Sequence, residues 1–133
     1  MMRALPLALL LLAPVSLHAQ PLLDGAGFAA ATQGNTFVFS LDGVPYGAEQ
    51  YLPGNRVNWS FLDGRCLAGH WWQEAQKICF AYEDRPGENQ CWEFWQEGGG
   101  LRTRFTGDGA GGAVYSAQIA PEPLYCMGPD AGV

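Results

Sequence analysis

Short segments of alternating apolar and polar residues, each followed by a turn sequence, restrict the fold of this chain most strongly. In segment 56–61, for example, Val57, Trp59 and Phe61 fall on one face of a strand. Asp-Gly and Pro-Gly dipeptides, which favour tight turns, separate several of these segments. The expected strands are 36–41, 44–52, 56–61, 65–73, 77–82, 90–96, 101–105 and 113–119. Eight short strands in a meander predict an all-β fold, either a barrel or a sandwich, preceded by a short helix within 21–33.

The first 19 residues have the features of a secretory signal peptide. Arg3 supplies a positive charge, an apolar run follows it, and Ala19 stands at the expected cleavage position. The apolar run is shorter than the roughly 20 residues that a membrane span needs. We therefore expect a mature chain of residues 20–133, forming one domain that is periplasmic or secreted.

Four cysteines lie in the expected mature chain, and an even number in an exported protein predicts two disulfides. We favour Cys79–Cys91, because these residues fall opposite each other when segments 77–82 and 90–96 pair. The other pair is then Cys66–Cys126. Structural zinc is the alternative, but it needs closely spaced cysteine pairs, which this chain lacks.

The expected mature chain is strongly acidic. Its net charge is −7, because cleavage removes Arg3 from a chain whose formal net charge is −6. Phosphate backbones and anionic lipid surfaces repel such a protein, which argues against a nucleic-acid or membrane partner. The glycine-rich segments 98–100 and 107–112 lack the context of a phosphate-binding loop. We therefore expect no cofactor, and a small ligand or another protein as the partner.

The residues that could perform acid–base chemistry are few. His70 is the one histidine of the expected mature chain, and no nucleophile or metal-binding motif accompanies it. Glu83, Asp84 and Glu88 cluster in a predicted loop, where carboxylates are ordinarily solvated. Two carboxylates held about 5–9 Å apart could cleave a glycosidic bond. No catalytic or metal-binding residue is assigned from the sequence.

Most of the tryptophans are expected in the core. Trp71 and Trp72 are adjacent, so they point to opposite sides of a strand. Either Trp72 or Trp95 is therefore expected to be partly exposed. Together with His70 and the acidic loop, these two tryptophans form the surface that the sequence nominates for a ligand or partner.

The order of turns, cysteines and aromatic residues resembles that of a group of small uncharacterised periplasmic proteins from proteobacteria. The motifs that carry the resemblance are Gly34-Asn35-Thr36, Asp42-Gly43, Tyr46, Tyr51-Leu52-Pro53-Gly54, Gly69-His70-Trp71-Trp72, Ile78-Cys79-Phe80-Ala81-Tyr82 and Cys91-Trp92-Glu93-Phe94. The resemblance covers about residues 22–94. It implies an exported β domain and provides no catalytic residues.

The sequence thus favours an exported, non-enzymatic β domain that binds a small ligand or a partner protein. One alternative is an inhibitor of an extracellular hydrolase such as a lysozyme, because an acidic surface suits a basic target. Another is a carboxylate-based hydrolase. An apolar cavity inside the domain would favour ligand binding. A filled core with an exposed acidic loop would favour inhibition, and two converging carboxylates would favour catalysis.

Overall fold

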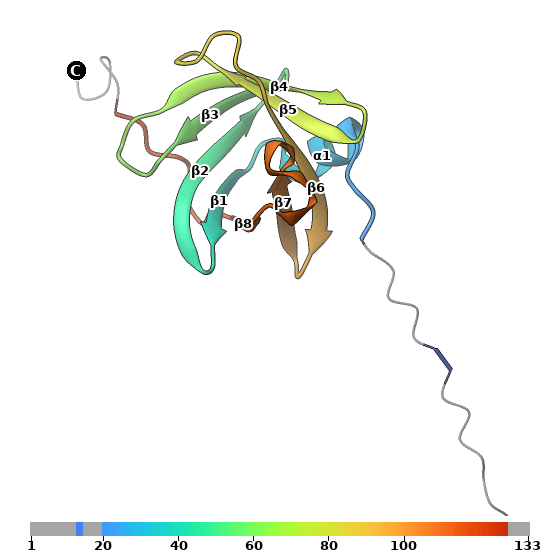
Figure 1. The fold of residues 1–133 in the computed structure, drawn as a ribbon. Coiled ribbons are helices and arrows are strands. Elements are labelled where there is room, and N and C mark those ends of the chain that lie inside the picture. Colours follow the sequence, from blue (N-terminus) through green and yellow to red (C-terminus); the bar gives the residue numbers. More distant parts are fainter. Residues whose placement is uncertain (1–12, 15–19, 128–133) are drawn as a thin grey trace, which may run out of the picture.

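A computed structural model describes residues 13–14 and 20–127. Its eight antiparallel strands close into a barrel (Figure 1). The elements are α1 (Gly25–Thr32), β1 (Thr36–Leu41), β2 (Val44–Leu52), β3 (Arg56–Ser60), β4 (Leu67–Glu74), β5 (Lys77–Tyr82), β6 (Gln90–Glu97), β7 (Gly100–Phe105), the 3-10 helix η1 (Thr106–Gly111) and β8 (Val114–Ile119). The all-β prediction with a short leading helix is confirmed. The predicted signal peptide, residues 1–19, lies almost wholly outside the described residues. Within the described part, no helix is long and apolar enough to cross a membrane.

Pairing between the first and last strands closes the barrel. Phe37 on β1 lies opposite Ile119 on β8, and Ser40 lies opposite Ser116. Every other pairing joins strands that are consecutive in the chain. Closure satisfies the hydrogen-bonding groups that the two edge strands of an open sheet would expose.

Local turn chemistry accounts for most strand boundaries. β1, β2 and β5 begin and end at the predicted residues. Between β1 and β2, Asp42 and Gly43 have φ angles of 49° and 79°, the left-handed conformation that a two-residue hairpin turn requires.

One local prediction is wrong. Cys66 precedes β4 instead of lying within it, because the Arg65 amide bonds to the Asp63 side chain and keeps this segment in a turn. Most of the glycine-rich segment 107–112 lies within η1. The Thr106 hydroxyl fixes the start of η1 by donating to the Cys91 carbonyl at 2.8 Å.

Helix α1 closes one end of the barrel interior. Asp24 caps it by accepting a hydrogen bond from the Gly27 amide, as this residue type does at a helix start. Phe28 is completely buried, and its ring centroid lies 5.5 Å from that of Tyr51 and 4.6 Å from that of Phe94. The Leu23 amide also donates to the Phe94 carbonyl at 2.7 Å. These contacts hold the helix against the inward-facing rings of the sheet.

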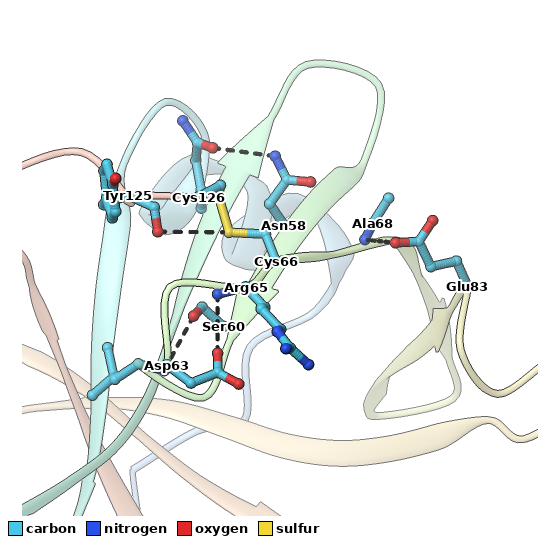
Figure 2. The surroundings of a disulfide bond; sticks show 11 residues. Asn58, Ser60, Asp63, Arg65, Cys66, Ala68, Glu83, Tyr125 and Cys126 are labelled. Atoms are coloured by element: carbon cyan, nitrogen blue, oxygen red, sulfur yellow. Dashed lines mark hydrogen bonds between the residues drawn. A yellow bond between two sulfur atoms is a disulfide. The ribbon is translucent and has the colours of Figure 1, made fainter. Parts of the chain in front are cut away.

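Both predicted disulfides are formed. Cys79 and Cys91 lie directly opposite each other on β5 and β6, with their Cα atoms 3.9 Å apart. Cys66 and Cys126 join the β3–β4 connection to the segment that follows β8, with a Cα separation of 5.4 Å (Figure 2). One disulfide therefore staples a hairpin, and the other links segments 60 residues apart.

Candidate functional site: a cavity inside the barrel

A cavity of about 130 Å³ lies inside the barrel beyond the residues that contact α1. Phe80 and Phe94 line it and also pack against Phe28, so they separate the cavity from the helix. An engineered protein cavity of about 150 Å³ accommodates benzene, which sets the scale for a compact ligand. The lining residues are Phe39, Tyr46, Glu49, Trp59, Phe61, Leu67, Phe80, Tyr82, Asp84, Arg85, Gln90, Trp92, Phe94, Thr103 and Tyr115.

Aromatic rings form most of the cavity wall. The ring centroid of Tyr46 lies 5.8 Å from that of Trp59 and 5.4 Å from that of Tyr115. Tyr115 in turn lies 5.8 Å from Trp92, in an edge-to-face arrangement. Tyr46 and Phe61 are 46% and 47% exposed, so these two rings stand where the cavity meets solvent. The site is therefore an aromatic chamber that solvent reaches from one side.

A bulge in β2 places Tyr46 at this chamber. Phe39 pairs with Gly47 but Ser40 pairs with Pro45, so Tyr46 is an extra residue on β2. Gly47 then provides room for the neighbouring indole, because a Cβ atom there would lie only 2.3 Å from the Trp59 ring. The bulge and the glycine together let two large rings share one wall.

One carboxylate is buried in the cavity lining. Glu49 on β2 is 2% exposed, and the Tyr82 hydroxyl on β5 donates to its Oε2 at 2.5 Å. Burial raises the pKa of Glu49 to about 7, although the bond from Tyr82 and the nearby Tyr51 hydroxyl act in the opposite direction. Near neutral pH the Glu49 carboxyl is therefore divided between its charged and neutral forms.

The two tyrosines beside Glu49 remain hydrogen-bond donors. Burial, followed by the proximity of the Glu49 charge, raises the pKa of both Tyr51 and Tyr82 well above the ordinary value. The Tyr51 hydroxyl is buried and has no hydrogen-bond partner of ordinary geometry among the described residues, but it lies close enough to Glu49 to lower the pKa of that carboxyl. Glu49 is thus surrounded by hydroxyl groups and rings, and no described salt bridge reaches it.

The predicted acidic loop borders the cavity through one of its three acids. Asp84 lines the cavity together with Arg85, whose Nε lies 3.6 Å from Asp84 Oδ2. Glu83 instead accepts a hydrogen bond from the Ala68 amide at 3.1 Å, near the start of β4 (Figure 2). Glu88 is exposed and does not line the cavity.

The aromatic surface nominated from the sequence lies on the outer wall of the barrel. Trp72 and Trp95 are both half-buried there, whereas one partly exposed tryptophan was expected. The Trp72 indole donates to Glu74, and the Trp95 indole donates to Glu97, each at 3.1 Å. His70 packs on Trp72, with ring centroids 5.3 Å apart. None of these three aromatic residues lines the cavity.

The sequence-based reading missed Glu49, Tyr46 and Tyr82 as site residues. The alternation in β2 carried a usable indication, because Glu49 and Tyr51 are two residues apart and so share a face. A large aromatic residue such as Tyr51 is expected on the buried face of a strand, so Glu49 on the same face is expected to point inward as well. The bulge at Tyr46 interrupts the same alternation, which hides the pattern in the sequence.

The chamber offers little support for metal binding or carboxylate catalysis. The one described cluster of metal-binding side chains is Glu74, Cys79 and Cys91, and its cysteines are joined to each other. Glu49 is the one buried carboxylate of the described lining, while Asp84 is at the rim beside an arginine. The geometry is that of a compact, largely aromatic cavity with one buried carboxylate in its described lining. Comparisons of the chain with protein-family models, curated proteins and solved structures found no match.

Proposed function

We propose that the protein is an exported, non-enzymatic binding protein that holds a small ligand inside its barrel. The observation that carries this proposal is the aromatic cavity of about 130 Å³ with a single buried carboxylate. Small-molecule sites are typically concave and mostly apolar, with a few polar groups that fix the orientation of the ligand. Nine of the fifteen lining residues of this barrel are aromatic, and polar groups such as Glu49, Gln90 and Thr103 stand among them.

The proposed location is the periplasm or the extracellular space. Two disulfides are typical of proteins that work in an oxidising compartment. The predicted signal peptide points to the same location. A ligand in that location reaches the cavity from solvent, on the side where Tyr46 and Phe61 are exposed.

Ligand binding fits the site better than the two alternatives from the sequence. A retaining or inverting hydrolase needs a pair of carboxyl groups at a defined separation in one cleft, and Asp84 is engaged with Arg85 at the rim. An inhibitor would use the acidic loop, but Glu83 is bonded to the Ala68 amide, and the loop borders a cavity instead of covering a filled core.

Blocking the chamber tests this proposal. Leu67 is half-buried in the cavity lining, so Leu67→Trp should place an indole in the space that a ligand would occupy. The probes are benzylamine, benzyl alcohol and benzoate, three compact aromatic compounds of different charge. We expect calorimetric titration to show saturable binding of at least one probe to the wild-type protein, and a loss of at least about tenfold in its affinity for Leu67→Trp.

Val114→Trp is the matched control. Val114 is exposed on β8 and does not line the cavity, so its replacement adds the same side chain at a distance from the site. This variant should bind the probe as the wild-type protein does. Equal affinities for the wild-type protein and a folded Leu67→Trp variant would contradict binding inside the barrel.

A further inference from the structure

The charge and the rings of the cavity lining select among ligands. Resting on the proposed binding function, we propose that the ligand is a compact organic cation, a protonated amine. Its charged end would pair with Glu49, and its body would lie against the aromatic wall.

The charge balance of the lining favours a cation. Apart from tyrosines, the ionisable side chains of the described lining are Glu49, Asp84 and Arg85. Arg85 is balanced by Asp84, since these two groups lie 3.6 Å apart at the exposed rim. The Glu49 carboxylate has a hydroxyl donor in Tyr82 and no described basic partner. A cationic ligand would supply the charge that this carboxylate lacks.

When no cation is bound, a proton can neutralise the buried Glu49 carboxylate. A buried charge without a counter-charge is costly, and a carboxyl group can avoid that cost by taking up a proton. Burial raises the pKa of Glu49 to about 7, so the protonated and charged forms of this carboxyl have similar free energies near neutral pH. A bound cation would favour the charged form, so ligand and proton should compete for the same group.

The wall supports the same ligand class. The faces of tryptophan and tyrosine rings carry negative electrostatic potential and attract cations, most strongly where water is excluded. Tyr46, Trp59 and Trp92 contribute such rings to the lining. An anionic ligand would be repelled by both the ring faces and Glu49, and a neutral ligand would leave Glu49 without a counter-charge.

Matched probes test the inference on the wild-type protein. At about pH 8, benzylamine is a cation, benzyl alcohol is neutral and benzoate is an anion. We expect benzylamine to bind at least about tenfold more tightly than benzyl alcohol, and benzoate to bind most weakly.

The same probes report the competition with the proton. Lowering the pH to about 5.5 should weaken benzylamine at least about tenfold and leave benzyl alcohol nearly unchanged, because Glu49 then takes up a proton. The other titratable and charged groups around Glu49 are the Tyr51 and Tyr82 hydroxyls, from β2 and β5, and Asp84 with Arg85 at the rim. The neutral probe controls for changes at those groups.

Glu49→Gln assigns the preference to the carboxylate. Glutamine keeps an acceptor for Tyr82 but has no charge, so the preference for benzylamine should disappear. Glu74→Gln is the control, because it makes the same change in net charge at an exposed outer position and should preserve the preference.

The possible outcomes separate the two proposals. If benzyl alcohol or benzoate binds as tightly as benzylamine and Leu67→Trp abolishes this binding, the binding function stands and the cation inference is overturned. If no probe binds, or if Leu67→Trp changes no affinity, the binding function fails and the inference fails with it. A pH-dependent preference for benzylamine that Glu49→Gln removes supports both.

Discussion

Reduction of both disulfides is expected to unfold the domain near room temperature. The chain-entropy model assigns about 3 kcal/mol to a loop such as that closed by Cys79–Cys91, and about 4 kcal/mol to the longer loop closed by Cys66–Cys126. Together they approach the total stability of an ordinary domain, about 5–15 kcal/mol. The measurement is the melting temperature with and without a thiol reductant, followed by circular dichroism.

Two double variants separate the contributions. Replacing Cys66 and Cys126 with serine should lower the free energy of unfolding by about 4 kcal/mol, because the bond mainly restricts the unfolded chain. Replacing Cys79 and Cys91 should cost about 3 kcal/mol. If reductant left the melting temperature of the wild-type protein unchanged, the disulfides would not stabilise the folded domain.

The free energy of unfolding should fall by about 3 kcal/mol through Glu49 alone as the pH rises from 4.5 to 7. The folded-state pKa of Glu49 is about 7, against 4.5 for an ordinary glutamate. Between these values the folded protein binds more protons than the unfolded chain does. The contribution is therefore complete below pH 4.5 and is lost as the pH rises through 7.

Comparison with Glu49→Gln isolates this contribution. Denaturant unfolding of both proteins across this pH range measures the difference, in which the effects of other titrating groups largely cancel. The wild-type protein should lose stability relative to the variant as the pH rises. A pH-independent difference between them would show that Glu49 titrates alike in the folded and unfolded states.

The same group connects stability with binding. At neutral pH the buried Glu49 carboxylate lowers the free energy of unfolding, and a bound cation would offset part of this destabilisation. Binding residues commonly reduce the stability of the empty protein in this way. A preference for a cation should therefore be accompanied by a rise in melting temperature when benzylamine is added at neutral pH.

The sequence predicted the strands and the hairpin disulfide well, because both depend on local patterns. Alternation places Ile78, Phe80 and Tyr82 on one face of β5, and the two aromatic residues, Phe80 and Tyr82, line the cavity. The opposition of Cys79 and Cys91 follows from the pairing of two neighbouring strands. These features need information only from adjacent segments.

Barrel closure and the site depend on information from distant segments. The β1–β8 pairing brings Phe39 opposite Ala117, a contact that no local period encodes. All eight strands contribute residues to the cavity wall, and the bulge at Tyr46 disrupts the alternation that could have revealed Glu49. The sequence predicts that either Trp72 or Trp95 is partly exposed at a binding surface, whereas both are half-buried on the outer wall of the barrel, away from the cavity.

Ligand binding inside the barrel is tested most directly by ¹H–¹⁵N spectra of the tryptophan indoles during titration with benzylamine. Trp59 and Trp92 line the cavity, whereas Trp72 and Trp95 lie on the outer wall and serve as internal controls. Binding inside the barrel predicts saturable shifts of the Trp59 and Trp92 indole signals, with the Trp72 and Trp95 signals unchanged. Saturable shifts confined to Trp72 and Trp95, or no shift of any indole, would contradict it.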